Sequence, residues 1–252
     1  MYKAQSRVAR DTALFVVRSL IAYVVTVVYI AIAGPIGLIA GIVFRSTDGL
    51  YRLGHGGVRL ALALAGIRWR VVGREHVPAT AVVYCSNHES NVDPPVLFEA
   101  LHPRLKILYK AELRKVPIMK TAFDVAGFVA VDRGDREQAF ASIAKGAESL
   151  RRGHPFLIFP EGTRSKTGNL LPFKKGGFIM ALEAGAPIVP VAIQGGRNAM
   201  RKGSAFVRPV NVSVRIGSPV PTAGLSMSDR DALIAQVRAE VQKLLDEGPL
   251  WS

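Results

Sequence analysis

The sequence predicts an α/β protein, in which a mostly parallel, twisted sheet is covered by helices on both faces. An N-terminal hydrophobic two-helix segment that anchors the chain to a membrane precedes it. Three observations predict this fold: a long uncharged stretch near the N-terminus, short apolar runs alternating with helical stretches after residue 67, and runs that are continuously apolar. We therefore expect residues 1–67 to form membrane-associated helices and residues 68–252 to form the α/β domain.

The N-terminal stretch from residue 19 to residue 44 contains no charged side chain. A straight helix of that length would more than cross a hydrocarbon core of about 30 Å. Basic residues stand on both sides of it, so the positive-inside rule predicts no orientation. Gly34-Pro35 interrupts the run near its middle, which favours two short helices entering and leaving one leaflet over a single span or a buried soluble pair.

The rest of the chain alternates between predicted strands and helices. Apolar runs predict strands at residues 68–73, 81–86, 106–110, 127–131, 155–160, 188–193 and 211–216. Residues 135–152 carry a helical stripe of Phe140, Ile143, Ala147 and Leu150, with Asp135 and Gln138 as a capping pair. A second stripe (Leu233, Ile234, Val237, Val241, Leu244 and Leu245) predicts a helix from after Ser228 to Gly248.

The composition limits the chemistry. The 252 residues carry a net charge of +14 and a single Cys, which excludes an internal disulfide, and no clustered Cys/His metal site is visible. Aromatic residues do not interleave with the basic ones as a nucleic-acid stacking surface requires. The charge therefore favours anionic membrane lipids or a phosphorylated substrate, and we expect no nucleic-acid partner.

The loop CSNHESNVDPP, residues 85–95, holds the first candidate catalytic pair. His88 and Asp93 are close enough in sequence for their side chains to meet in a turn that begins a helix. A neutral imidazole can take a proton from an alcohol when its other ring nitrogen donates to a carboxylate. The spacing by itself is more often found in ordinary polar loops.

The turn FPEGTRS, residues 159–165, follows an apolar strand and holds the second candidate. Gly162 allows backbone N–H groups to approach an anion, and Arg164 offers a two-pronged donor to phosphate. Glu161 is a possible acceptor for polyol hydroxyls. Alone, the turn is equally typical of a charged surface turn.

Taken together, the motifs form an ordered series: NHxxxxD at residues 87–93, YKAEL, GFVAVDR, FPEGTRS and VPVAIQG. This series resembles the motif signature of the 1-acylglycerol-3-phosphate acyltransferases, over roughly residues 68–220. The two most specific motifs, NHxxxxD and FPEGTRS, match without departure. The resemblance implies a glycerol-3-phosphate acyltransferase-like fold, and the N-terminal pair is similar to the two-helix anchor of some bacterial members.

The resemblance also implies the reaction and the roles of individual residues. A fatty acyl group would pass from acyl-CoA or acyl carrier protein to the free hydroxyl of lysophosphatidic acid, giving phosphatidic acid for phospholipid biosynthesis. His88 would be the general base and Asp93 its orienting partner. The implied substrate-binding residues are Asn87, Lys110, Arg133, Glu161, Gly162, Thr163 and Arg164. Neither a metal nor an organic cofactor is expected.

Other interpretations remain open at this stage. Cys85 or Ser86 would be the nucleophile of a covalent mechanism, although an activated thioester requires none. The acceptor would alternatively be another lysophospholipid, a lyso-ornithine lipid or a glycolipid. A non-catalytic lipid-binding membrane protein is the remaining alternative. Thioester donors place the active site on the cytosolic face of the cytoplasmic (inner) membrane, and the other histidines, His55 among them, lack an acidic partner in a recognisable motif.

Overall fold

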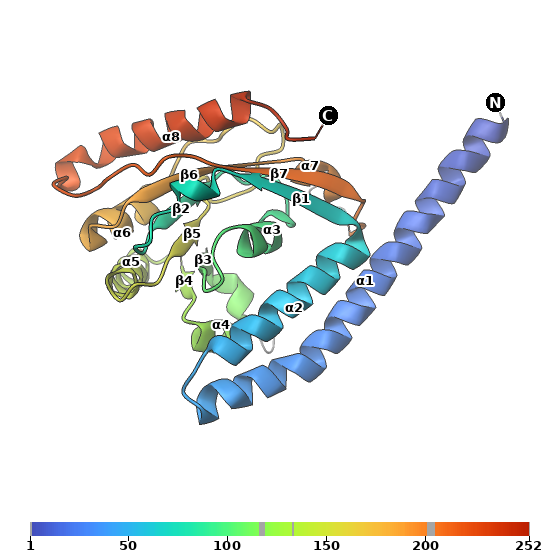
Figure 1. Ribbon diagram of the computed structural model, residues 1–252, viewed down its shortest axis with the longest axis horizontal. Coiled ribbons are helices and arrows are strands. Elements are labelled where there is room, and N and C mark those ends of the chain that lie inside the picture. The colour runs from blue at the N-terminus through green and yellow to red at the C-terminus, as the bar shows by residue number, and fades with distance from the viewer. Residues whose placement is uncertain (1, 116–118, 133, 201–204, 252) are drawn as a thin grey trace.

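The computed structural model describes residues 2–115, 119–132, 134–200 and 205–251. One seven-stranded sheet lies at the centre of the chain, with helices on both faces and a long N-terminal helix along one side (Figure 1). The strands are β1 (Ile67–Val72), β2 (Val83–Ser86), β3 (Lys106–Lys110), β4 (Val129–Val131), β5 (Phe156–Ile158), β6 (Ile188–Gln194) and β7 (Val210–Ile216). Each lies within or next to one of the predicted ranges.

The strand order is β1-β7-β6-β2-β5-β3-β4. From β6 to β4 every pairing is parallel, whereas β7 runs antiparallel to β6 and β1 runs parallel to β7. The predicted mostly parallel α/β sheet is confirmed. The carboxyl ends of β2, β5 and β6 lie side by side, which is where loops between parallel strands form sites.

The helices divide into two layers because neighbouring residues of a strand face opposite sides of the sheet. Tyr84 packs in one core with α2 (Asp48–Ala65), α3 (Asp93–Ala100) and α7 (Gly196–Ala199). Val83 and Cys85 pack in the other core with α5 (Arg136–Arg151), α6 (Gly176–Ala184) and α8 (Arg230–Asp246). The remaining helical segments are α4 (Met119–Ala126) and three short 3-10 turns, η1 (Arg74–His76), η2 (Ala111–Lys115) and η3 (Met227–Asp229).

The two N-terminal helices meet at a different place from the predicted one. Helix α1 (Tyr2–Val43) continues through Pro35 and curves near its C-terminal end (Figure 1), and the reversal lies at residues 44–47, before α2. The predicted break at Gly34-Pro35 is therefore wrong. Proline removes one helical hydrogen bond, but the apolar helix formers on both sides carry the helix through the resulting bend.

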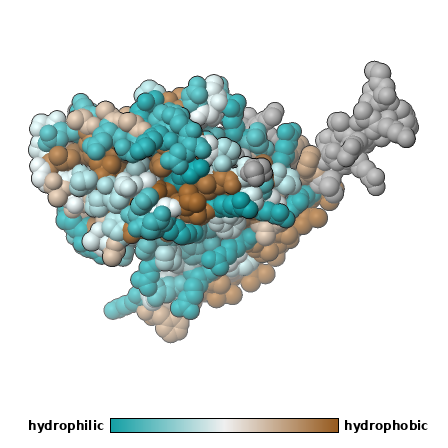
Figure 2. All heavy atoms as spheres, turned by 45° about the horizontal axis from the view of Figure 1, so that its top comes forward, coloured by the Kyte–Doolittle hydropathy of each residue, from teal (hydrophilic) through white to brown (hydrophobic). Residues whose placement is uncertain are grey.

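The surface of α1 is mostly apolar and exposed. Phe15–Val43 is long and apolar enough to cross a membrane, and only 11% of its most apolar window is buried against the rest of the chain. In Figure 2 this surface forms a brown band beside the largely teal domain. The division of the chain at residue 67 stays a prediction, since α2 runs into β1 with only Gly66 between them.

The two predicted amphipathic helices are present. Asp135 accepts a hydrogen bond from the Gln138 N–H at 3.0 Å, so the predicted cap of α5 is confirmed. Leu233, Val237 and Val241 of α8 are buried as expected. Phe140 is the exception, because it is 49% exposed at the margin of the α5 stripe.

Candidate active site

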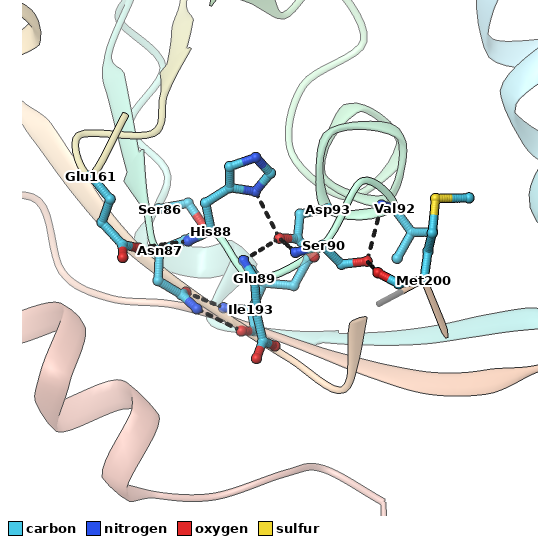
Figure 3. A network of polar contacts seen from close by, with 10 residues as sticks. All are labelled: Ser86, Asn87, His88, Glu89, Ser90, Val92, Asp93, Glu161, Ile193 and Met200. Atoms are coloured by element: carbon cyan, nitrogen blue, oxygen red, sulfur yellow. Dashed lines mark hydrogen bonds and ion pairs between the residues drawn. The ribbon is translucent and has the colours of Figure 1, made fainter. Parts of the chain in front are cut away.

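His88 and Asp93 meet at the start of α3. The Nδ1 of His88 lies 2.9 Å from Oδ2 of Asp93, and since the carboxylate accepts, the ring donates from Nδ1. This leaves the lone pair on Nε2, which has no hydrogen-bond partner among the residues that the structure describes and points away from the loop (Figure 3). The ring stacks on Phe159 with centroids 4.3 Å apart. A neutral imidazole held this way can act as a base.

Asp93 is fixed more firmly than the ring it orients. Its side chain is fully buried, and its Oδ2 also accepts from the backbone N–H groups of Glu89 and Ser90, each at 2.7 Å. The other oxygen, Oδ1, is buried without a hydrogen-bond partner among the described residues and lies against Gly196. A Cβ at Gly196 would lie 2.4 Å from that oxygen. Sequence reasoning missed Gly196, which stands directly after the VPVAIQG motif.

The NHxxxxD loop, residues 87–93, is held against neighbouring segments by buried polar contacts. The Asn87 amide bonds both the N–H (2.8 Å) and the C=O (2.9 Å) of Ile193 on β6, and so extends the pairing of β2 by one residue. Oε1 of Glu161 accepts from the His88 N–H at 2.8 Å, and Oε2 accepts from the Leu171 N–H at 3.0 Å. These bonds hold the NHxxxxD loop and the FPEGTRS turn together.

The FPEGTRS turn closes over the same loop. The Ser165 N–H donates to the His88 carbonyl at 2.8 Å. Gly162 has a φ of +69°, a conformation that favours glycine, which explains why a glycine occupies this position of the turn. The Glu161 side chain is buried, burial raises its pKa, and both of its oxygens already hold backbone groups. Its direct contact with substrate stays a prediction.

The predicted phosphate-binding side chains are placed differently from one another. Arg164 is partly exposed on the turn beside His88, and Thr163 is exposed. Lys110 is exposed at the end of β3, where it forms a surface ion pair with Glu112 at 2.7 Å. Arg133 lies outside the described residues. The structure adds Lys174, which lines a small cavity of about 90 Å³ with Phe159.

Glu89 is a carboxylate that sequence reasoning missed. Burial and the nearby Asp93 raise its pKa to about 7, and its Oε1 has no hydrogen-bond partner among the described residues. Its side chain points away from the His88 ring (Figure 3). Glu89 is therefore partly buried close to Asp93, but its side chain does not face the open Nε2 of His88.

The two alternative nucleophiles have no surface from which to attack. Cys85 is fully buried, and burial, with the nearby Glu161, raises the pKa of its thiol. Ser86 is also fully buried, and its hydroxyl donates to the Asn87 carbonyl at 3.0 Å. His88 is thus the reactive group of this loop that reaches solvent.

A larger apolar pocket of about 400 Å³ lies beside the dyad. Pro94 and Pro95, directly after Asp93, line it, and α2 and α4 contribute Gly54, Val58 and Phe123. Its lining is almost wholly carbon. Pockets of this size and lining bind apolar ligand groups.

Comparisons with known proteins agree on one family. A family model described as Acyltransferase matches residues 68–194. The chain is 30% identical to the 1-acyl-sn-glycerol-3-phosphate acyltransferase of Borreliella burgdorferi over 75% of its own length and 76% of that protein. It is 34% identical to the mouse 1-acyl-sn-glycerol-3-phosphate acyltransferase alpha, over 73% of this chain and 66% of the mouse protein.

A solved structure is similar as well. The 1-acyl-sn-glycerophosphate (LPA) acyltransferase PlsC from Thermotoga maritima superposes with a TM-score of 0.80 at 26% identity, covering 94% of this chain and 97% of that one. The fold and these relatives define an enzyme that transfers an acyl group. The chain belongs to the acyltransferase family.

Proposed function

We propose that this acyltransferase moves a fatty acyl group from a thioester, acyl-CoA or acyl carrier protein, to the free hydroxyl of lysophosphatidic acid. The observation that carries the proposal is the buried Asp93 carboxylate, which orients His88 so that Nε2 is open, while the residues directly after Asp93 line an apolar pocket. The relatives named above act, by their names, on 1-acyl-sn-glycerol-3-phosphate. No cofactor takes part in the proposed reaction.

Nε2 of His88 takes the proton of the acceptor hydroxyl as its oxygen attacks the thioester carbonyl. Asp93 stabilises the imidazolium that results. The tetrahedral intermediate then collapses, the carbon–sulfur bond breaks, and the thiolate leaves with the proton from Nε2. The ester and the free thiol are the products, and His88 returns to its neutral form without a covalent enzyme intermediate.

The apolar pocket between α2, α3 and α4 is the proposed site of the acyl chain. Pro94 and Pro95, which directly follow Asp93, line it, so a chain lying in the pocket would bring its carbonyl group towards His88. Phe98 extends the lining along α3. The depth of this pocket would then set the preferred chain length.

The acceptor phosphate requires cations near the dyad. Arg164 stands in the turn that is bonded to the His88 backbone, and Lys174 lines the cavity beside Phe159. Arginine binds phosphate through two parallel hydrogen bonds. Lys110 stays a candidate for the same role, with Asn87 and Glu161 as positioning residues that hold the loop.

The exposed apolar surface of α1 supports a membrane location with α1 and α2 as the anchor. The acceptor and the product are lipids, and anionic lipids complement the net charge of the chain. Thioester donors are cytosolic, so the active site would face the cytosol at the inner membrane. Anchoring beside the apolar pocket shortens the path of the acceptor from the bilayer.

The test is acceptor-dependent thiol release by the full chain in detergent, with palmitoyl-CoA and palmitoyl carrier protein as donors. A panel of lysophosphatidic acid, lysophosphatidylcholine, lyso-ornithine lipid and a glycolipid is read by product mass. We expect phosphatidic acid as the main product. Release with a different acceptor would change the substrate within the same chemistry, and no acceptor-dependent release with either donor would make the chain a non-catalytic lipid binder.

A further inference from the structure

Helix α2 carries basic residues along one face. Arg52, His55 and Arg59 recur at spacings of three and four and therefore share one side of the helix. With Arg74 they line a cleft of about 450 Å³ that also includes Glu99. The cleft shares no lining residue with the apolar pocket beside His88, so the two lie on different flanks of α2.

One buried carboxylate organises this cleft. The Glu99 side chain is 1% exposed; Oε2 accepts from Arg59 Nε at 2.6 Å and Oε1 contacts His55 Nδ1. The other ring nitrogen of His55 lies 2.9 Å from the Pro103 carbonyl oxygen. Both ring nitrogens of His55 therefore contact oxygen atoms of this cleft. Glu99 thus holds the Arg59 guanidinium and the His55 ring side by side.

The side chains of the other two arginines have no acidic partner among the described residues. Arg52 and Arg74 are exposed, and their side chains make no hydrogen bond or ion pair with any residue that the structure describes. Guanidinium groups that converge on a cleft without acidic partners are suited to bind phosphate through paired hydrogen bonds. Arg59 and His55, both in contact with Glu99, line the same cleft beside these two donors.

The basic surface continues towards the apolar surface of α1. Arg59 also lines a neighbouring cleft of about 860 Å³ together with Arg18, Arg68 and Trp69. Arg18 lies on α1 near the start of the apolar segment, where its Nε donates to the Leu64 carbonyl at 2.6 Å. A lipid whose chains lie on α1 would bring its headgroup phosphate close to Arg18 and the two clefts.

We propose that the cleft formed by Arg52, His55, Arg59 and Arg74 binds a phosphate group at a site separate from the acyl-transfer centre. A lipid headgroup and free phosphate share this chemistry, and the continuity with α1 favours the headgroup. The proposal does not depend on the proposed function, because none of these side chains belongs to the His88 site.

The test uses the full chain in detergent and measures two affinities by the rise in its thermal unfolding temperature. The probes are inorganic phosphate at constant ionic strength and dihexanoyl-phosphatidylglycerol, with dihexanoyl-phosphatidylcholine as the zwitterionic comparison. The test variant is Arg52→Ala/Arg74→Ala. The matched control, Arg151→Ala/Arg152→Ala, removes the same charge from the C-terminal end of α5 and its cap, away from α2 (Figure 1).

We expect the test variant to lose about tenfold or more in affinity for the bound probe, while the control variant stays close to the parent. Tighter binding of the glycerolipid than of phosphate identifies a headgroup site, and binding of phosphate alone identifies a free-anion site. Equal losses in both double variants, or no loss in the test variant, would overturn the proposal. His88→Ala should abolish acyl transfer and keep this binding, so the two proposals fail independently.

Discussion

The two ends of α3 carry two histidine–carboxylate pairs that are nearly alike. At the N-terminal end His88 pairs with Asp93, and at the C-terminal end His55 pairs with Glu99. Both ring side chains are 16% exposed, and both carboxylates are essentially buried. Each ring also stacks on a phenylalanine with centroids 4.3 Å apart. The pair itself therefore does not distinguish a catalytic site from a structural one.

The difference lies at the second ring nitrogen. Nε2 of His55 is occupied by the Pro103 carbonyl, whereas Nε2 of His88 is open. Glu99 also holds Arg59, while Asp93 holds only N–H groups of its own loop and the ring. A histidine becomes a base only where one nitrogen is fixed and the other keeps its lone pair. Similar contacts thus give a proton acceptor at one end of α3 and a ring with both nitrogens occupied at the other.

Removing each histidine ring in turn tests most directly whether the two pairs differ in function. We expect His88→Ala to lower kcat on the order of 10⁴-fold, because no other group can accept the hydroxyl proton. His55→Ala should keep kcat near the parent value and lower the free energy of unfolding by about 1–3 kcal/mol, since Glu99 loses a buried partner. Steady-state thiol release and urea unfolding measure the two effects. Normal turnover by His88→Ala would refute the general-base assignment.

The two carboxylates, Asp93 and Glu99, should differ in the same way as their histidine partners. Asp93→Asn should lower kcat on the order of 10³-fold, since the neutral amide no longer stabilises the imidazolium or enforces the tautomer. Glu99→Gln should leave kcat close to the parent value. The ratio of single-turnover rates for the two variants checks the prediction, and comparable losses would mean that both pairs serve catalysis.

Much of this architecture could be predicted from the sequence, for physical reasons that differ between regions. All seven strands were found because strands buried on both faces are continuously apolar. The dyad was found because His88 and Asp93 belong to one loop. The His55–Glu99 pair was missed because its members are 44 residues apart and meet only when α2 packs on α3. The reversal after α1 was misplaced because Pro35 bends a helix without ending it when apolar neighbours sustain it.

Gly196 tests how tightly the active end of α3 is positioned. Gly196→Ala places a Cβ 2.4 Å from Asp93 Oδ1, and three hydrogen bonds to Oδ2 prevent that side chain from moving freely. A displaced Asp93 misdirects the ring, so we expect kcat to fall on the order of 10²-fold. Gly49→Ala on α2 is the matched control because its Cβ meets no atom within 4 Å. Equal activity of both variants would show that the dyad tolerates movement.

Glu89, at the His88 end of α3, should make the free energy of unfolding depend on pH. Its pKa is about 7 in the folded chain against 4.5 in the unfolded chain, so between these pH values the folded state holds a proton that the unfolded state has released. The free energy of unfolding should therefore fall by up to about 3 kcal/mol as the pH rises through this range. Glu89→Gln should remove most of that fall.

Urea unfolding in detergent at pH 4.5 and pH 7.5 measures the pH dependence of the unfolding free energy in the parent and in Glu89→Gln. Burial raises the pKa of Glu161 as well, which adds a pH dependence of the same sign that is present in parent and variant alike. An unchanged slope in Glu89→Gln would place the proton elsewhere.

The apolar pocket that runs along α3 between the two pairs provides the last and smallest test. Gly54 lines the pocket, and a Cβ there meets no atom within 4 Å, so Gly54→Leu fills space without disturbing the helix. We expect the ratio of kcat/KM for palmitoyl to decanoyl donors to fall by about tenfold, because the longer chain loses apolar contacts. Gly49→Leu, outside the pocket, should keep the parent ratio. An unchanged ratio in Gly54→Leu would mean that the acyl chain lies elsewhere, and that α3 separates two polar sites without a lipid between them.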